Sequence, residues 1–559
     1  MLKLLRLLFL LLPASVGIAQ STGEVGFDRQ FGEPGAPGSF HAYFSRLGGG
    51  LKGLQLTDHY KSVAAARNSP HTPADYMLLT FAPNGDDHGL RLVGTPAETH
   101  FEQDLATAEW TYQERDSGVV FSIDSGKGLV LEKNLTHDPT QRGFRLEFVL
   151  RNRDAEPGGQ VVFTLLGPAL VNAPEVSLLG TSSVAIADSG DGAPKHVGPA
   201  PGKVQPLDVD LKNLSFAGNT NRFFGAFLYP LDDASRAALV GVAADTVPAR
   251  EDPDSKTPPN SVARARYTMS LAIPARDAET RVSFGLYLGP KSYHVFEKLA
   301  NPERFAPILN VDLTTPCCFV EVPGGRFMAR VLLRLLGWFH DVIGNWGFAI
   351  IMLTLLVRGL LAPVNYHMQK SMRAYGARMA VLKPKLDALK AKYGDDQKAY
   401  QQAMVAFQRE HKMIPPIGGC LPLFATMPIY IGLFTALRTA YDLRHQSFGL
   451  WIQDLSRADA LFHLSFWPHE FNLLPLLWIS MFVWLQLRMP LPTDPQARQM
   501  QKMMRYMPIL FGVMLYGYAS ALLVYMVTSM VWSMLESAIM KRLLGPIDPN
   551  VAAMAPTPM

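Results

Sequence analysis

Two patterns of hydrophobic and polar positions divide this chain near residue 325. Before that point apolar residues recur at every second position, in short runs separated by glycine and proline. After it they form long runs that contain almost no charge. Alternation with a period of two is typical of half-buried strands, and an apolar run of about 20 residues is typical of a membrane-spanning helix. The pattern therefore predicts an all-β part followed by an α-helical membrane part.

The strand pattern is clearest between Phe144 and Arg151, where four apolar residues fall on one face and three charged residues on the other. Segments 119–123 and 282–288 alternate in the same way. Short strands with many turns over residues 20–325 predict a large β-sandwich. The charged, proline-rich segment 249–261 is predicted to be an exposed loop.

No residue of the β-rich part stands out as catalytic. Gly48-Gly49-Gly50 is not followed by the Lys-Ser/Thr pair of a phosphate-binding loop, so we interpret it as a turn between strands. The adjacent Cys317 and Cys318 could pair with each other only under strain, and we expect free thiols. Carboxylates are frequent, which leaves a glycosidase-like pair open without singling one out. Four histidines lack metal-ligand spacing and are expected at the surface or in loops: His41, His59, His71 and His88.

The first 19 residues have the features of a targeting segment. Lys3 and Arg6 precede the apolar run Leu7–Ala19, which is shorter than the ~20 residues that a span needs. This pattern predicts a signal peptide cut before Gln20, with an uncleaved signal anchor as the alternative. In both cases residues 20–325 are exported, because the positive charges stay inside.

Residues 326–343 predict an amphipathic helix. Arginines recur there every four residues and leucines form an apolar stripe. This pattern is typical of a helix that lies in the membrane interface. The alternative is a surface helix that packs on the β-domain. The residues that carry the pattern are Arg326, Arg330 and Arg334, with Leu332, Leu335, Leu336 and Phe339.

The apolar runs in residues 344–545 predict a bundle of five membrane spans. A single span from Tyr506 to Leu535 would be overlong and would place Lys541 and Arg542 outside, so we expect a tight hairpin that turns near Gly517–Ala521. A retained N-terminal segment would add a sixth span. The predicted spans are about 345–365, 417–437, 471–488, 506–519 and 520–540.

The charges of the connecting segments give the orientation. The predicted helical hairpin 366–416 has ten Lys/Arg against four Asp/Glu, whereas the segment 438–470 has three against four. By the positive-inside rule the hairpin and the basic loop 488–505 are cytoplasmic. The hairpin is basic enough to touch lipid headgroups or ribosomal RNA. The basic residues that we single out are Lys383, Lys385, Lys390 and Lys392 in the hairpin, and Arg498, Lys502 and Arg505 in the second loop.

Composition sharpens this division. Of the 24 Met and 8 Trp in the 559 residues, 21 Met and 7 Trp come after residue 325. The net charge is only +4, which gives no reason to expect DNA binding. Three cysteines without a CxxC motif exclude a disulfide framework.

One charge lies inside the first predicted span. Arg358 comes twelve residues after Trp346, about 18 Å along a helix and beyond the middle of a ~30 Å hydrocarbon core. An arginine near the membrane centre costs roughly 2.5–3.5 kcal/mol on insertion scales, which favours a water-filled cavity around it. Thr354, one turn earlier on the same face, would line that cavity. The alternative is that Arg358 extends its side chain to the inner headgroups.

Short strings in the membrane part occur in the order and with the spacing of a known family. Over residues 340–542 the chain resembles YidC-type membrane protein insertases of the bacterial form with a large periplasmic domain. Gly48-Gly49-Gly50-Leu51 and Tyr287–Lys291 resemble that family's β-supersandwich, which is related to sugar mutarotases. The strings in the membrane part are Gly344–Phe348, Val357-Arg358-Gly359, Lys383-Pro384-Lys385, Gly418-Gly419-Cys420 with Pro422, Met427-Pro428, Trp451-Ile452 with Asp454-Leu455, Thr493-Asp494-Pro495 and Met507-Pro508.

The resemblance implies a mechanism. The family's spans enclose a hydrophilic groove, open to cytoplasm and lipid, in which the arginine matching Arg358 attracts acidic or polar segments of an incoming chain. Thr354 and Tyr525 match other residues that line it. The resemblance implies a non-enzymatic insertase and chaperone of the bacterial inner membrane, with its β-domain in the periplasm and no cofactor or metal. The implied partners are nascent membrane-protein chains, the Sec translocon, the ribosome through the cytoplasmic loops, and membrane lipids.

The chain departs from the family pattern at three places. Ala519-Ser520-Ala521 stands where the family commonly has Pro-Ser-Gly, and Met526 stands where a second tyrosine is frequent. The tail 546–559, predicted to be disordered, has no basic extension, which argues against ribosome docking through it.

Two other function classes remain open at this stage. The β-domain could be a sugar-binding or sugar-isomerising periplasmic enzyme on a membrane anchor, although no His/Glu pair for that chemistry can be identified. A transporter with Arg358 as an anion site is the other, although no inverted repeat of spans is visible.

Overall fold

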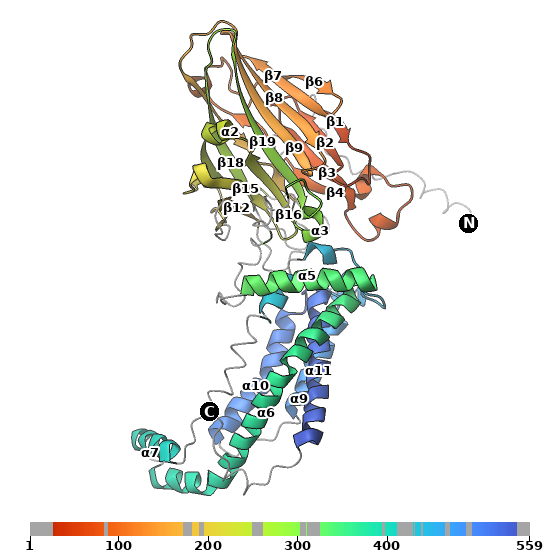
Figure 1. Cartoon of the computed structure of the whole chain (residues 1–559), viewed down its shortest axis with the longest axis vertical. Coiled ribbons are helices and arrows are strands. Elements are labelled where there is room, and N and C mark those ends of the chain that lie inside the picture. Colours follow the sequence, from red (N-terminus) through yellow and green to blue (C-terminus); the bar gives the residue numbers. More distant parts are fainter. Residues whose placement is uncertain are drawn as a thin grey trace, which may run out of the picture. The chain divides into compact units, whose positions relative to one another are not determined.

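The computed structural model forms two compact units, residues 1–311 and 312–559, and each is described by itself (Figure 1). The N-terminal segment 1–19, Cys317 and Cys318, most of the predicted span 417–437 and the tail 546–559 lie outside the described residues, as do residues 249–260. The structure describes residues 26–82, 88–171, 182–188, 195–248, 261–301, 309, 325–393, 397–410, 429, 431–437, 440–463, 470–487 and 495–544.

The first unit is a large antiparallel β-sandwich, as predicted. Its largest sheet has nine strands in the order β13 (Lys195–Val197), β12 (Ser183–Asp188), β15 (Leu214–Thr220), β16 (Phe224–Pro230), β19 (Glu279–Pro290), β9 (Gly143–Asn152), β8 (Leu129–Asp138), β7 (Gly118–Asp124) and β6 (Thr111–Arg115). One five-stranded sheet is β1 (Gly26–Phe31), β2 (Phe40–Ser45), β3 (Leu51–Tyr60), β4 (Tyr76–Phe81) and β11 (Ala169–Leu170). The other is β14 (Gln205–Pro206), β17 (Leu239–Pro248), β18 (Ser261–Ala272), β10 (Gln160–Leu166) and β5 (Leu92–Val93).

Alternation along β9 explains how the layers join. Its four predicted inward residues are buried, and they meet both smaller sheets. The ring of Phe144 lies 5.5 Å from that of Phe40 on β2, and the ring of Phe148 lies 5.3 Å from that of Phe163 on β10. Aromatic pairs at these distances add to the burial of apolar area, so the large sheet forms one layer and the two smaller sheets cover it.

The glycine turn between β2 and β3 covers a buried lysine. Gly48 and Gly49 have φ of +61° and +56°, a conformation that favours glycine, and the prediction of a turn is confirmed. Lys133 on β8 has 0% exposure, and its Nζ donates hydrogen bonds to the carbonyl oxygens of Leu90, at 2.8 Å, and Gly49. Burial lowers the pKa of Lys133 to about 7.

Lys133 should make the stability of the β-unit depend on pH. Between about pH 7 and its ordinary pKa near 10.5, the unfolded chain binds a proton there that the folded chain has released. The free energy of unfolding therefore rises with pH in this window, and we expect a gain of about 1–2 kcal/mol from pH 7 to pH 9. Pulse proteolysis of the full-length protein in urea, following cleavage within the β-unit, measures this gain.

The Lys133→Met variant is the control for that measurement. Methionine keeps the length of the side chain and removes its titration, so the unfolding free energy of the variant should lack the rise that the wild type shows from pH 7 to pH 9. Parallel pH profiles for the two proteins would contradict the assignment of the effect to Lys133.

A second charged cluster is buried between β3 and the β8–β9 turn. The Nη2 atom of Arg142 lies 2.6 Å from Oδ2 of Asp58, and both side chains are 5% exposed. Burial by itself raises the pKa of Asp58, but the hydrogen bond from His59 and the charges of His59 and Arg142 outweigh it and lower that pKa to about 2. The carboxylate is therefore ionised throughout the physiological pH range, and removing one partner alone would leave an uncompensated buried charge.

The histidine prediction was only partly right. His41 lies on β2 beside Asp28, His59 lies on β3, and His88 has 0% exposure. The strand positions of His41 and His59 differ from the prediction of surface or loop histidines, whereas His88 lies in a loop as predicted but is buried. His71 is exposed and its Nε2 lies 3.0 Å from the hydroxyl of Tyr60.

The second unit is helical. Within the residues described, two helical segments are long and apolar enough to cross a membrane, Trp346–His367 and Ser520–Met540, and Leu473–Leu487 is a shorter apolar helix. The helices are α5 (Gly325–Ile343), α6 (Trp346–Tyr393), α7 (Gln397–Glu410), α9 (Leu473–Leu487), α10 (Pro495–Met514) and α11 (Ser520–Leu544). The segment before α9, described over residues 440–463 and 470–472, adds the 3₁₀ turn η6 (Tyr441–Leu443) and the short strands β20 (Phe462–His463) and β21 (Glu470–Phe471).

The helices extend across two boundaries between predicted spans and basic segments. The first span and the first arm of the basic hairpin form one helix, α6, whose 48 residues continue through Pro363 and Pro384. The predicted second basic loop is also largely helical, because Arg498, Lys502 and Arg505 lie on α10 together with most of the fourth predicted span. The predicted hairpin turn is confirmed, since residues 515–519 separate α10 from α11.

Helix α5 confirms the amphipathic pattern, and its leucine stripe packs inside the unit. Leu332, Leu336 and Phe339 are buried in one cluster with Trp346 and Ile350 of α6. The opposite side of α5 keeps large apolar residues exposed: Phe327, Trp338 and Val342. The leucine stripe therefore anchors α5 to the start of α6.

Candidate functional site

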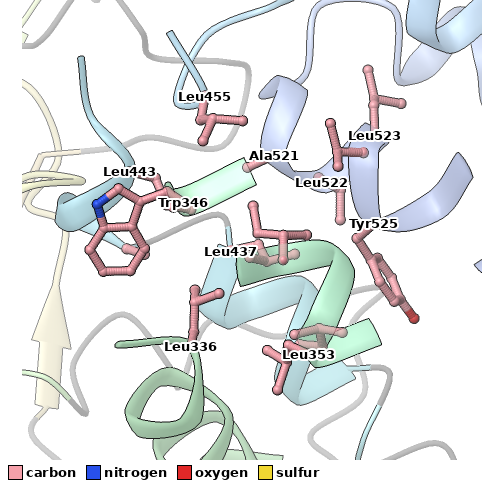
Figure 2. Close-up of a cluster of buried hydrophobic side chains, with 14 of the residues drawn as sticks. Leu336, Trp346, Leu353, Leu437, Leu443, Leu455, Ala521, Leu522, Leu523 and Tyr525 are labelled. Atoms are coloured by element: carbon pink, nitrogen blue, oxygen red, sulfur yellow. The ribbon is translucent and has the colours of Figure 1, made fainter. Parts of the chain in front are cut away.

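Helices α6 and α11 begin in one apolar cluster and run in the same direction. Trp346 and Leu353 of α6 are buried with Ala521, Leu522 and Tyr525 of α11 (Figure 2). In this view the phenolic oxygen of Tyr525 points away from the cluster. Because both helices start at the same level and pack along each other, residues at equal distances from their starts lie at similar depth.

A network of hydrogen bonds connects the segment 440–463 to the starts of α6 and α11. Asn345 accepts from the backbone N–H of Phe348 at 3.1 Å and donates to the carbonyl oxygen of Phe448 at 3.2 Å. The hydroxyl of Ser520 donates to the carbonyl oxygens of Asp454 and Arg457 at 2.9 and 2.6 Å. The segment that follows η6 is therefore held against the N-terminal ends of α6 and α11.

Asp459 fixes the start of α9 in the same network. Its Oδ2 accepts hydrogen bonds from the backbone N–H groups of Leu473 and Leu474 at 2.8 and 3.0 Å, and from Nε1 of Trp451 at 3.0 Å. The carboxylate is 3% exposed and lies where the helix dipole is positive.

Arg358 and Thr354 lie on one face of α6, as predicted. Thr354 is 1% exposed, and its hydroxyl donates to the carbonyl oxygen of Ile350 at 2.6 Å, so its hydrogen-bonding need is met within its own helix. Arg358 is partly buried. Asn365, seven residues further on, shares this face of α6.

Glu536 of α11 is the charged residue that our reading of the sequence missed. It is 8% exposed, hydrogen-bonds to the side chain of Asn365 and interacts electrostatically with Arg358. Glu536 directly follows the uncharged run 506–535. It comes eleven residues after Tyr525, which is three helical turns and places both residues on the same helix face, and this spacing could have identified it from the sequence.

Further polar atoms line the same face of α11. Within the part of the chain that the structure describes, Ser529 Oγ, Trp532 Nε1 and Glu536 Oε1 are buried and make no hydrogen bond. Tyr525, Ser529, Trp532 and Glu536 follow the i, i+4, i+7, i+11 spacing of one helix face. We call this face, together with Thr354, Arg358 and Asn365 of α6, the polar seam.

The predicted basic residues lie elsewhere. Lys383, Lys385, Lys390 and Lys392 lie on the part of α6 beyond the apolar segment Trp346–His367. Lys385 and Lys392 are exposed, and the Nζ of Lys392 lies 5.1 Å from the ring centre of Tyr393. Arg498, Lys502 and Arg505 lie on the first half of α10. The seam and these basic segments are thus separate features of the unit.

Comparison with known proteins identifies the helical unit. Residues 338–545 match the model of a family described as 60Kd inner membrane protein. Curated relatives called membrane protein insertase YidC are 34% identical over 259 residues in Pseudoalteromonas atlantica, 37% over 279 residues in Aeromonas hydrophila and 36% over 268 residues in Neisseria meningitidis. Over this region the helical unit is similar to YidC-type insertases. The resemblance stated from the sequence strings is confirmed for this region.

The extent of the YidC match is limited to part of each protein. The aligned regions cover 46–50% of this chain and 42–45% of those three relatives. A solved structure titled as an active YidC insertase with its first transmembrane domain resolved aligns over 89% of this chain and 90% of its own, at 16% identity and a TM-score of 0.32.

Proposed function

We propose that this protein is a membrane protein insertase and chaperone that moves short polar segments of a new membrane protein through the polar seam. The family match of the helical unit supports this function. The observation that carries it is the placement of Arg358, which lies beside Glu536 in the seam between two apolar helices. A charge inside a membrane span marks a functional pathway by default.

Physical chemistry gives the proposed steps. The polar atoms of the seam replace part of the water around a translocated segment, which lowers its cost of entering the membrane, and the charge of Arg358 attracts acidic groups in it. The following apolar segment then moves from the seam into lipid, which is favourable by about 25 cal/mol per Å² of buried apolar surface. No nucleotide hydrolysis is required for these steps.

The orientation and partners belong to the same proposal. The five predicted spans place the basic end of α6, helix α7 and the first half of α10 in the cytoplasm, where they would meet the ribosome, the emerging chain and the Sec translocon. The β-sandwich, as a supersandwich of the mutarotase-related kind, would lie in the periplasm of a bacterial inner membrane. The exposed apolar side of α5 would lie in the outer interface.

A crosslinking experiment tests the proposal directly. A photoreactive amino acid at Tyr525 should crosslink to a stalled nascent chain whose first span has just left the ribosome. The same group at Val513, an exposed position of α10, serves as the control and should give a much weaker product. Equal crosslinking from both positions, or none from Tyr525, would reject the seam as the path of the substrate. Flux of a small anion in liposomes without chain insertion would favour a transporter.

A further inference from the structure

Glu536 joins the two helices of the polar seam through charge. Its carboxylate hydrogen-bonds to Asn365 and interacts with Arg358, and these two residues lie two turns apart on α6. Counted from Trp346 on α6 and from Ser520 on α11, Glu536 lies about 24 Å along its helix, between the levels of Arg358 at about 18 Å and Asn365 at about 28 Å. The depth of the carboxylate therefore agrees with both of its contacts.

A buried carboxylate next to the arginine changes what the seam offers to a substrate. Alone, Arg358 would present a full positive charge, which would attract any acidic segment strongly. With Glu536 beside it, the pair is close to neutral as seen from a distance, and an incoming carboxylate has to compete for the guanidinium. An uncharged polar segment meets no such competition, and Glu536 Oε1, which makes no hydrogen bond among the described residues, can accept one from it.

We propose that Glu536 determines the specificity of the seam, acting as the built-in counter-ion of Arg358 that sets the balance between acidic and uncharged translocated segments. This inference rests on the proposed insertase function and adds a residue that governs its substrate range. Its physical basis is the hydrogen bond between Glu536 and Asn365 and the electrostatic interaction of Glu536 with Arg358 across two helices that pack along each other.

The test compares two model substrates that differ only in charge. Both are single-span proteins with the same short translocated tail, which carries three aspartates in one and three asparagines in the other. The full-length protein is reconstituted in liposomes of one lipid composition, and insertion is read as protection of the tail from protease. The measured quantity is the ratio of acidic-tail to neutral-tail insertion.

Removing the charge of Glu536 should change that ratio. In Glu536→Gln, which keeps the size and the hydrogen bond to Asn365, we expect the ratio to rise about fivefold because Arg358 is no longer neutralised. Glu536→Asp keeps the charge and should restore the wild-type ratio. Asp233→Asn, a loss of one fully exposed carboxylate in the β-unit, is the matched control and should leave the ratio unchanged.

The outcomes separate this inference from the proposed function. If the wild type inserts neither substrate, the insertase function itself fails. If the wild type inserts both and Glu536→Gln lowers both equally, Glu536 only supports helix packing and the specificity role is rejected. An unchanged ratio, or a lower one, in Glu536→Gln also rejects it while leaving the insertase function standing.

Discussion

Replacing Arg358 by alanine is expected to lower the insertion of proteins with short acidic tails at least tenfold, whereas Arg358→Lys should keep most of it. The alanine variant loses the positive charge that attracts the tail and leaves Glu536 as a buried, uncompensated carboxylate that repels it. Lysine restores a positive charge at the same depth. Insertion into liposomes that contain each full-length variant, read as protease protection of the tail, measures the effect.

A double variant makes the Arg358 prediction sharper. If repulsion by Glu536 causes part of the loss, Arg358→Ala combined with Glu536→Gln should insert acidic tails better than Arg358→Ala alone, although less well than the wild type. Two variants at positions that interact electrostatically are expected to be non-additive in this way. Wild-type insertion by Arg358→Ala would remove Arg358 from the mechanism, and equal losses for alanine and lysine would show that shape, rather than charge, matters at this position.

The periodicity of the chain was enough to predict the class of each unit. Strands β7, β9 and β19 lie where the period of two placed them, and the apolar face of β9 is buried. The burial of Lys133 was missed, although it shares the phase of Leu131 and Leu135 on β8. A charged residue in the apolar phase of a strand is buried only when tertiary carbonyl oxygens bind it, and here they come from Gly49 and Leu90, far away in sequence.

Helix boundaries were harder to predict, because hydropathy indicates the surroundings of the side chains and not whether the backbone hydrogen bonds of a helix continue. The segment beyond His367 becomes polar while the backbone of α6 continues, so the end of the apolar segment is not the end of the helix. The loop predicted at 488–505 was wrong from Pro495 on, because the basic residues there belong to helix α10. The prolines in α6 and α10 remove one donor each without ending the helix, because the residues on both sides favour it.

The candidate site was only half visible in the sequence. Arg358 and Thr354 could be found because a charge in an apolar run and a spacing of four are local features. Glu536 required knowledge that α11 packs along α6 in the same direction, which no pattern within one helix gives. Once that pairing is known, Asn365, Arg358 and Glu536 form one interacting polar group.

Asp459→Ala is expected to lower the free energy of local opening at the start of α9 by about 2–3 kcal/mol. The substitution leaves two backbone N–H groups at the start of α9 and the indole N–H of Trp451 without their acceptor, and each such loss costs about 1 kcal/mol or more. Local opening at Leu473 and Leu474 should become about 100-fold more frequent. Hydrogen exchange followed by mass spectrometry on the peptide that covers the start of α9 measures this change.

Asp459→Asn is the matched control, because it separates the hydrogen bonds from the charge. Oδ2 accepts all three hydrogen bonds, and Oδ1 makes none within the described residues, so an amide oxygen can take the first position and the amide nitrogen the second. The asparagine variant should therefore exchange at a rate between those of the wild type and the alanine variant. If the alanine variant exchanges no faster than the wild type, Asp459 does not hold the start of α9. If the start of α9 opens as expected in Asp459→Ala while insertion stays normal, the hydrogen bonds of Asp459 stabilise the helices without taking part in substrate passage.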